Sequence, residues 1–159
     1  MSVRVVVAED SLTARKRIVM ALEAQPGIEV VGEAKNGKEA IEMVQALRPD
    51  VLTLDMVMPQ VGGLAVTEYL MALCPTPILI VSIAENTYEA RAAGAVALLD
   101  KAPSDSDDGS WEAELAGAVR TVALAKVAPR LPAELDSKTL LAMPISSAIN
   151  ALRAASRNG

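Results

Sequence analysis

The stretch Val51-Leu52-Thr53-Leu54-Asp55-Met56-Val57-Met58-Pro59 gives the clearest indication of the fold. Its first four residues form a short, largely apolar run, which is typical of a central strand buried on both faces of a parallel sheet. Asp55 then lies at the carboxyl end of that strand, where open α/β sheets bind their ligands. A carboxylate at this place can be a metal ligand, an acid–base group or a nucleophile.

Strand-like and helix-like segments alternate on both sides of this stretch. Ser11 is placed to cap the first helix, and Ser110 is placed to cap the last one of the sheet domain. Asn36 and Glu39 resemble a capping box at the start of the second helix. The alternation predicts an α/β fold with a doubly wound, five-stranded parallel sheet and helices on both faces. We expect its strands over residues 3–8, 28–34, 51–54, 78–81 and 96–99.

The last part of the chain has a different pattern. Pro129 and Pro132 indicate a linker, and Pro144 is suited to begin a helix. The four apolar residues Ile145, Ala148, Ile149 and Leu152 share one face of that helix. We therefore divide the chain into a domain of residues 1–128 and a C-terminal helical extension of residues 129–159, a linker and a short helix that could begin an effector region.

Composition excludes several classes of function. The chain has 159 residues, of which 52% are hydrophobic, so it can form a substantial core. We expect a cytoplasmic protein that does not enter a membrane, because the sequence lacks a spanning apolar stretch and a signal segment. The net charge of −5 argues against nucleic acid as a partner. Histidine is absent, so imidazole cannot serve as a base, a metal ligand or a phosphate carrier.

Polar residues follow four of the five expected strands. They are Glu9 and Asp10 after the first, Asp55 after the third, Ser82 after the fourth and Lys101 after the fifth. Because parallel strands end at the same edge of a sheet, these side chains can converge. Crowded carboxylates suit Mg²⁺, and a hydroxyl and an ammonium suit phosphoryl oxygens. This set of residues favours Asp55 as both a nucleophile toward phosphorus and a metal ligand.

At these residues the chain resembles the receiver domains of two-component response regulators, which have a flavodoxin-like (βα)5 fold. The resemblance covers roughly residues 2–128 and is nearest to receivers attached to chemotaxis methylesterases. The segments that carry it are Val5-Val6-Val7-Ala8-Glu9-Asp10-Ser11, Leu54-Asp55-Met56-Val57-Met58-Pro59 with Gly62-Gly63-Leu64, Pro75-Thr76-Pro77-Ile78-Leu79-Ile80-Val81-Ser82, and Lys101.

The resemblance implies a role for each residue of this set. Asp55 would accept a phosphoryl group from a histidine kinase. Asp10, Asp55 and the backbone carbonyl of Val57 would bind Mg²⁺ directly, and Glu9 would act through water. The remaining two side chains would contact the phosphoryl group, Ser82 by a hydrogen bond and Lys101 by charge. The output partner would be an effector protein or a C-terminal effector domain, and a homodimer is possible.

One departure from the family pattern and three alternative functions accompany this interpretation. Receivers commonly have an aromatic switch residue in the fifth strand, where this chain has Leu98. An alternative function is therefore a receiver-like interaction module that signals without phosphorylation. A haloacid dehalogenase type of enzyme would need a second acid two positions after Asp55, where Val57 stands. A serine–histidine esterase site cannot form without histidine. Any catalysis would be limited to self-phosphorylation from a phosphodonor and autodephosphorylation.

Overall fold

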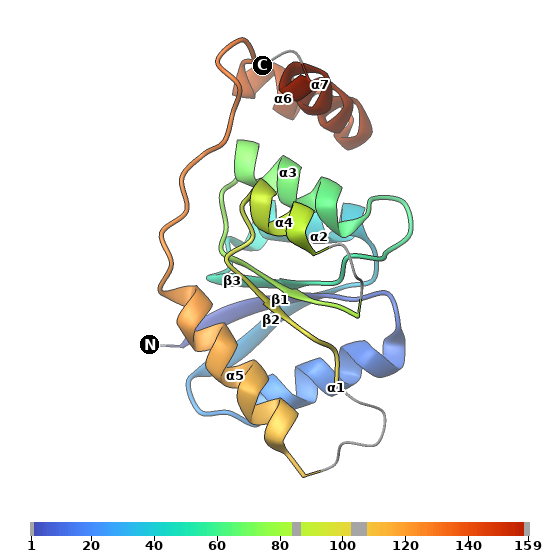
Figure 1. Ribbon diagram of the computed structural model, residues 1–159. Coiled ribbons are helices and arrows are strands. Elements are labelled where there is room, and N and C mark those ends of the chain that lie inside the picture. Colours follow the sequence, from blue (N-terminus) through green and yellow to red (C-terminus); the bar gives the residue numbers. More distant parts are fainter. Residues whose placement is uncertain (1, 84–86, 103–107, 158–159) are drawn as a thin grey trace.

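The computed structural model describes residues 2–83, 87–102 and 108–157. Five strands form one parallel sheet in the order β2-β1-β3-β4-β5, so the predicted doubly wound sheet is confirmed. Helices α1 and α5 cover one face of the sheet, and α2, α3 and α4 cover the other (Figure 1). The strands are β1 (Val3–Ala8), β2 (Ile28–Ala34), β3 (Val51–Leu54), β4 (Ile78–Val81) and β5 (Ala97–Leu99).

The central strands explain why the fold could be recognised from short apolar runs. All residues of β3 and β4 are buried, because these strands have neighbours on both edges and helices on both faces. Alternate residues enter two separate cores. Val5, Val7 and Val51 pack toward α1 and α5, whereas Val6 and Leu52 pack toward α2 and α3. Every substitution in these strands therefore affects one core or the other.

The helix starts agree only in part with the predicted caps. Ser11 Oγ accepts a hydrogen bond from the backbone N–H of Ala14 at 3.3 Å, and Asn36 caps α2 in the same way. The prediction that Ser110 caps α5 was wrong. Gly109 is the cap residue and adopts a left-handed conformation with φ of 81°. The helices of the sheet domain are α1 (Leu12–Glu23), α2 (Gly37–Leu47), α3 (Gly63–Leu73), α4 (Tyr88–Ala93) and α5 (Ser110–Ala123).

The C-terminal extension forms two helices, α6 (Ser137–Ala142) and α7 (Ile145–Arg157), of which only α7 was expected. The connecting segment runs from α5 on one face of the sheet to the outer side of α3 on the other (Figure 1). Arg130 anchors this segment, because its backbone N–H donates to the Met71 carbonyl and its guanidinium donates to the Ala92 carbonyl. Both acceptors lie near helix C-termini, which favour a positive charge.

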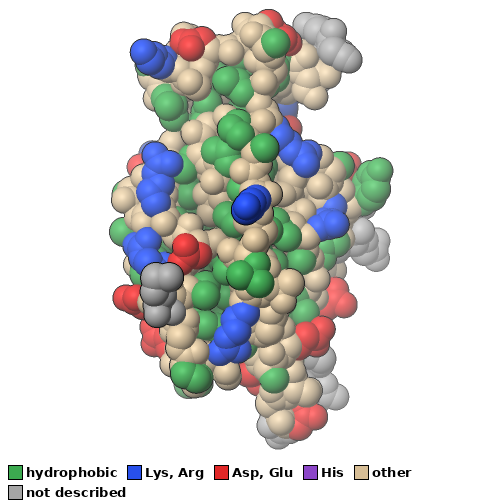
Figure 2. Space-filling model, turned by 90° about the vertical axis from the view of Figure 1, so that its left-hand side faces the viewer, with side chains coloured by type: hydrophobic (Ala, Val, Ile, Leu, Met, Phe, Trp, Pro, Cys, Tyr) green, Lys and Arg blue, Asp and Glu red, His purple; other side chains and the backbone are tan. Residues whose placement is uncertain are grey.

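The charges on one side of the surface and the lengths of the helices bear on nucleic-acid binding and on membrane insertion. On the side shown in Figure 2, Lys and Arg side chains stand apart from one another and are mixed with acidic and apolar side chains. A continuous basic stripe of the kind that binds nucleic acid is not visible on that side. Within the described part of the chain, every helix is too short or too polar to cross a lipid bilayer.

Candidate functional site

The predicted site residues are held by the ends of the strands. The backbone ladder continues for one residue beyond three of them: Glu9 donates to the Ala34 carbonyl, Asp55 to the Ala8 carbonyl and Ser82 to the Leu99 carbonyl, at 2.9, 3.2 and 3.1 Å. These bonds fix the backbone from which each side chain extends. The structure therefore provides a rigid platform at the carboxyl edge of the sheet.

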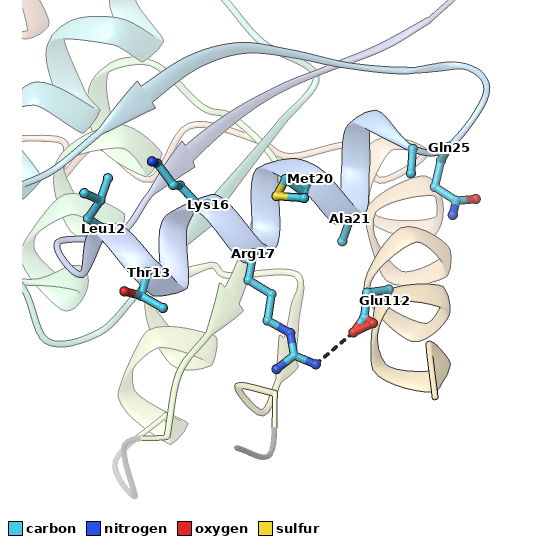
Figure 3. Close-up of a pocket in the computed structure, with 9 residues that line it drawn as sticks. Leu12, Thr13, Lys16, Arg17, Met20, Ala21, Gln25 and Glu112 are labelled. Carbon is cyan, nitrogen blue, oxygen red and sulfur yellow. Dashed lines mark hydrogen bonds and ion pairs between the residues drawn. The ribbon is translucent and has the colours of Figure 1, made fainter. Parts of the chain in front are cut away.

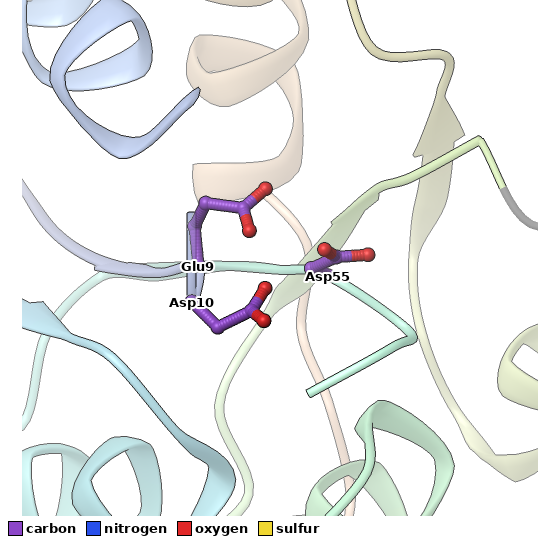
Figure 4. A group of neighbouring side chains, drawn as sticks. All are labelled: Glu9, Asp10 and Asp55. Atoms are coloured by element: carbon purple, nitrogen blue, oxygen red, sulfur yellow. The ribbon is translucent and has the colours of Figure 1, made fainter. Parts of the chain in front are cut away.

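Three carboxylates meet at this edge. Glu9, Asp10 and Asp55 each offer an oxygen within 4.8 Å of the other two, and their side chains point toward a common place (Figure 4). Glu9 and Asp55 are buried, whereas Asp10 is exposed to solvent. The cluster is thus buried on the side of the sheet and open on the side from which a ligand would arrive.

Asp55 accepts hydrogen bonds on both of its oxygens. Its Oδ1 accepts from Ser82 Oγ at 2.9 Å and from the backbone N–H of Val57 at 3.2 Å, while its Oδ2 accepts from Lys101 Nζ at 2.9 Å. Ser82 follows β4 and Lys101 follows β5. These two residues are 27 and 46 positions from Asp55 in the sequence, and both contact its carboxylate. The predicted convergence of all five strand-end side chains is therefore present.

Lys101 links two of the three carboxylates. Its Nζ lies 2.6 Å from Glu9 Oε1 and 2.9 Å from Asp55 Oδ2. Burial lowers the pKa of Lys101, but the hydrogen bonds and charges of Glu9 and Asp55 outweigh burial and raise its pKa above the usual value. Lys101 is therefore a permanent positive charge at neutral pH, held beside the Asp55 carboxylate.

Burial is the main cause of the pKa shift of Glu9. Burial raises the pKa of Glu9; the bonds from Lys101 and from the Ser11 backbone N–H lower it, and the charge of Asp55 raises it, with a net rise. Sequence reasoning did not identify the residue that also holds the Glu9 backbone: Arg15 donates a hydrogen bond to its carbonyl at 2.8 Å. Only the short spacing of an arginine after the acidic pair could have suggested this contact.

We expect Glu9→Gln to increase the free energy of unfolding of the metal-free chain near neutral pH. Because the folded-state pKa of Glu9 is raised, the stability that its neutral form contributes is complete below the ordinary value of 4.5 and is lost as the pH rises through the raised value. Glutamine stays neutral over that whole range. Urea unfolding in the presence of a chelator should show a larger free energy of unfolding for the variant than for the wild type. This difference should shrink as the pH falls toward 4.5.

The matched control for this measurement is Glu42→Gln on α2, because Glu42 is exposed and its substitution removes the same charge. The effect of Glu42→Gln on the free energy of unfolding should be small and should vary little over the same pH range. A Glu9→Gln chain that is less stable than the wild type near neutral pH would contradict the expected sign.

The donor set fits Mg²⁺. Three carboxylates face one ammonium group in the cluster, which leaves an excess of negative charge, and oxygen ligands are those that Mg²⁺ prefers. A cation there would reduce the repulsion that the buried pair Glu9 and Asp55 experiences. The backbone N–H of Val57, whose carbonyl was predicted to be a ligand, donates to Asp55 Oδ1 at 3.2 Å, so the Val57 backbone lies beside the cluster.

Leu98 lies apart from the carboxylates. It pairs with Ile80 in the sheet, is 41% exposed and comes from the edge strand β5. A leucine offers no hydroxyl or ring to Ser82, so a hydrogen-bonded switch of the aromatic type is not possible at this position. The nearest aromatic group to Lys101 along the chain is Trp111, whose Nε1 donates to the Asp100 carbonyl at 2.8 Å and so fixes the backbone beside Lys101.

A hollow of about 720 Å³ runs along α1 toward α5 rather than over the carboxylates (Figure 3). Arg17 crosses it to pair with Glu112 at 2.9 Å, and Lys16 leaves α1 on a different side. Arg15 pairs with Glu33 at 3.2 Å. The basic triplet of residues 15–17 is therefore divided among separate contacts and does not form one patch.

Comparison with known proteins gives a consistent result. The family model described as "response regulator receiver domain" matches residues 5–108. The protein-glutamate methylesterase/protein-glutamine glutaminase 4 of Myxococcus xanthus strain DK1622 is 39% identical over 136 residues, which are 81% of this chain and 38% of that protein. The chain thus spans less than half of the length of this curated relative.

Solved structures extend the similarity to the whole fold. The response regulator domain of Thermotoga maritima CheB superposes with a TM-score of 0.72 at 32% identity, covering 79% of this chain and 99% of that one. A two-component response regulator of the LuxR family from Aurantimonas sp. SI85-9A1 covers 97% of this chain and 99% of its own, with a TM-score of 0.67. At 23% identity, this second likeness supports the fold alone.

Proposed function

The chain belongs to the response regulator receiver domains of two-component systems, and we propose that Asp55 is the residue of this chain that accepts the phosphoryl group. The observation that carries the proposal is the environment of Asp55. It is 4% exposed, stands in the acidic cluster, and accepts hydrogen bonds from Ser82 and Lys101. A side chain with only a structural role at a turn would not need two donors from two other strands.

The proposed transfer begins with a carboxylate oxygen of Asp55, which attacks the phosphorus of a phosphohistidine on the donor protein. The new O–P bond forms as the P–N bond breaks. The imidazole is protonated on its other nitrogen, keeps the electron pair of the broken bond and leaves as the neutral ring. Hydrolysis ends the phosphorylated state: water attacks the phosphorus, inorganic phosphate and a proton leave, and the Asp55 carboxylate is restored.

The neighbouring side chains would position and neutralise the transferred group. Lys101 Nζ is already 2.9 Å from Asp55 Oδ2 and can turn toward the negative phosphoryl oxygens. Ser82 Oγ is 2.9 Å from Asp55 Oδ1, within reach of an oxygen on the same group. Asp10 and Asp55, with the Val57 carbonyl and with Glu9 through water, would hold Mg²⁺, which when bound neutralises charge on the phosphoryl group.

Receiver domains work with histidine kinases and with effector domains. For this chain we propose a histidine kinase as the phosphoryl donor and an effector protein or effector domain as the partner of the phosphorylated form. The similarity to methylesterases that are more than twice as long supports an attached effector domain, and the activity of such a domain is part of the proposal. A homodimer stays a prediction.

A phosphorylation experiment separates this proposal from a module that signals without phosphorylation. Incubation with acetyl phosphate and Mg²⁺ is expected to add the mass of one phosphoryl group, and a chelator should prevent the addition. Because an acyl phosphate is cleaved by hydroxylamine and a phosphoserine is not, hydroxylamine should remove the group. A chain that binds Mg²⁺ but gains no mass would favour the alternative that Leu98 suggested.

A further inference from the structure

Helix α3 is apolar on more sides than a surface helix of an α/β domain usually is. Eight of its residues are buried, and they include Tyr69, Leu70, Met71 and Ala72, four in succession. Four consecutive residues point in all directions around a helix, so the sheet alone cannot bury all four of them. The outer face of α3 is covered by α7 and α6, which lie above it in Figure 1 and contribute Leu140, Ala148, Ile149 and Leu152 to the same core.

Helix α7 also reaches the segment that follows Asp55. Residues 56–62 connect β3 to α3, and we call them the acidic-site loop. Met56 and Val61 of this loop belong to the same hydrophobic cluster as Ile149. A cavity of about 320 Å³ lies between the loop and α7, with Gln60 on one side and Asn150 and Arg153 on the other. The surfaces that α7 and the acidic-site loop turn toward each other are therefore partly apolar and partly polar.

An ion pair joins α7 to α3. Arg153 Nη2 and Nε lie 3.0 and 3.2 Å from one oxygen of Glu68, which is on the second turn of α3. Glu68 is 25% and Arg153 39% exposed in their side chains, so the pair is at the rim of the interface. Such a pair contributes little stability, but it sets the register of two helices that otherwise meet through apolar side chains.

The acidic-site loop is held on its other side by the first turn of α2. A Cβ on Gly37 would overlap the Val61 carbonyl oxygen, so the two backbones are in close contact. The loop is thus enclosed between α2 and α7. At its beginning, the Val57 N–H donates to Asp55 Oδ1, so a displacement of the loop changes the surroundings of the Asp55 carboxylate.

We propose that α7 is a positioning element for the acidic site: docked on α3 and on the acidic-site loop, it holds the loop in the conformation that binds Mg²⁺. This inference rests on the proposed function. Because coupling between two sites is reciprocal, occupation of the acidic site strengthens the docking of α7. The C-terminal extension then reports the state of Asp55 on the opposite face of the sheet from α5.

Replacing one buried and one exposed alanine of α7 by glutamate tests this coupling in the full chain. Ala148 is 0% exposed in the interface and Ala154 is exposed on the same helix, so Ala148→Glu should undock α7 and Ala154→Glu should not. Mg²⁺ affinity is read from the shift of the Val57 amide signal in a nitrogen-labelled chain. Hydrogen exchange of the amides of α7 and of β1 and β3 shows docking and the integrity of the sheet.

We expect Ala148→Glu to raise the Kd for Mg²⁺ about fivefold, at the lower end of couplings between sites, while the strands keep their protection. Ala154→Glu should match the wild type. In the wild type, saturating Mg²⁺ should slow exchange in α7 by a similar factor. An undocked α7 with unchanged Mg²⁺ affinity, or a wild-type α7 whose exchange ignores Mg²⁺, overturns the inference. A wild-type chain that binds no Mg²⁺ contradicts the proposed function instead.

Discussion

An Asp55→Asn chain is expected to gain no phosphoryl group from acetyl phosphate under conditions in which the wild type becomes phosphorylated. An amide oxygen is a poor nucleophile and cannot form a stable acyl phosphate, so the loss should be complete within detection. The carboxylate is also the group on which Ser82 and Lys101 converge, so an amide there weakens the electrostatic arrangement as well. Intact-mass spectrometry after incubation with Mg²⁺ and acetyl phosphate gives the result directly.

Asp100→Asn provides the control for this experiment. Asp100 also follows a strand and is adjacent to Lys101, but it is exposed and does not belong to the carboxylate cluster. It should be phosphorylated like the wild type. Phosphorylation of Asp55→Asn to a similar extent, with lability to hydroxylamine, would place the acceptor on another carboxylate; Asp10 would then be examined first because it is the exposed member of the cluster.

The sheet and the meeting of the strand-end residues could be predicted because both follow from burial. Strands such as β3 and β4 are buried on both faces and so appear as apolar runs. Once the strands are parallel, residues directly after them must share one edge, which is why Asp55, Ser82 and Lys101 could be grouped from the sequence. Their roles in phosphoryl transfer stay predictions, since geometry alone does not test a reaction.

Other contacts depend on details that local sequence does not contain. The link from Lys101 to Glu9 joins the end of β5 to the end of β1, with β4 and β3 between them in the sheet, and only the packed structure fixes that path. The cap of α5 was assigned to Ser110 because serine is a frequent cap, whereas the left-handed Gly109 is the cap residue and Ser110 is the first residue of the helix. Helix α6 has six residues and is stabilised through the buried Leu140, so its own sequence gives little indication of it.

The packing of α7 on the outer face of α3 could have been predicted from the sequence. The sequence Gly63-Leu64-Ala65-Val66-Thr67-Glu68-Tyr69-Leu70-Met71-Ala72-Leu73 has a single charged residue in eleven, which is unusual for a helix with one face in water. That charged residue, Glu68, pairs with Arg153 of α7. The apolar face predicted for α7 packs against the apolar outer face of α3, and the apolar pattern of each helix is present in the sequence.

Gly63→Ala is expected to destabilise the chain by about 3 kcal/mol, the size that overpacking against a rigid neighbour commonly reaches. A Cβ at this position would lie 2.6 Å from the Asp55 carbonyl oxygen and 2.7 Å from the Met56 Cα. Both atoms are backbone, so they cannot turn aside as a flexible side chain would. The Gly63 N–H also donates to the Met56 carbonyl at 2.9 Å, which holds the start of α3 against the acidic-site loop.

The neighbouring glycine gives a control of the same chemistry. At Gly62 the nearest atom to a new Cβ is the Met56 carbonyl oxygen at 3.6 Å, an ordinary contact, and φ is −74°, which alanine adopts readily. Gly62→Ala should therefore change stability by less than about 1 kcal/mol. Denaturant unfolding of both variants measures the difference, and equal midpoints would contradict the close approach. Because the clash displaces the backbone of Asp55 itself, any folded Gly63→Ala chain should also be phosphorylated more slowly than Gly62→Ala, which connects the packing of one methyl group to the chemistry of the site.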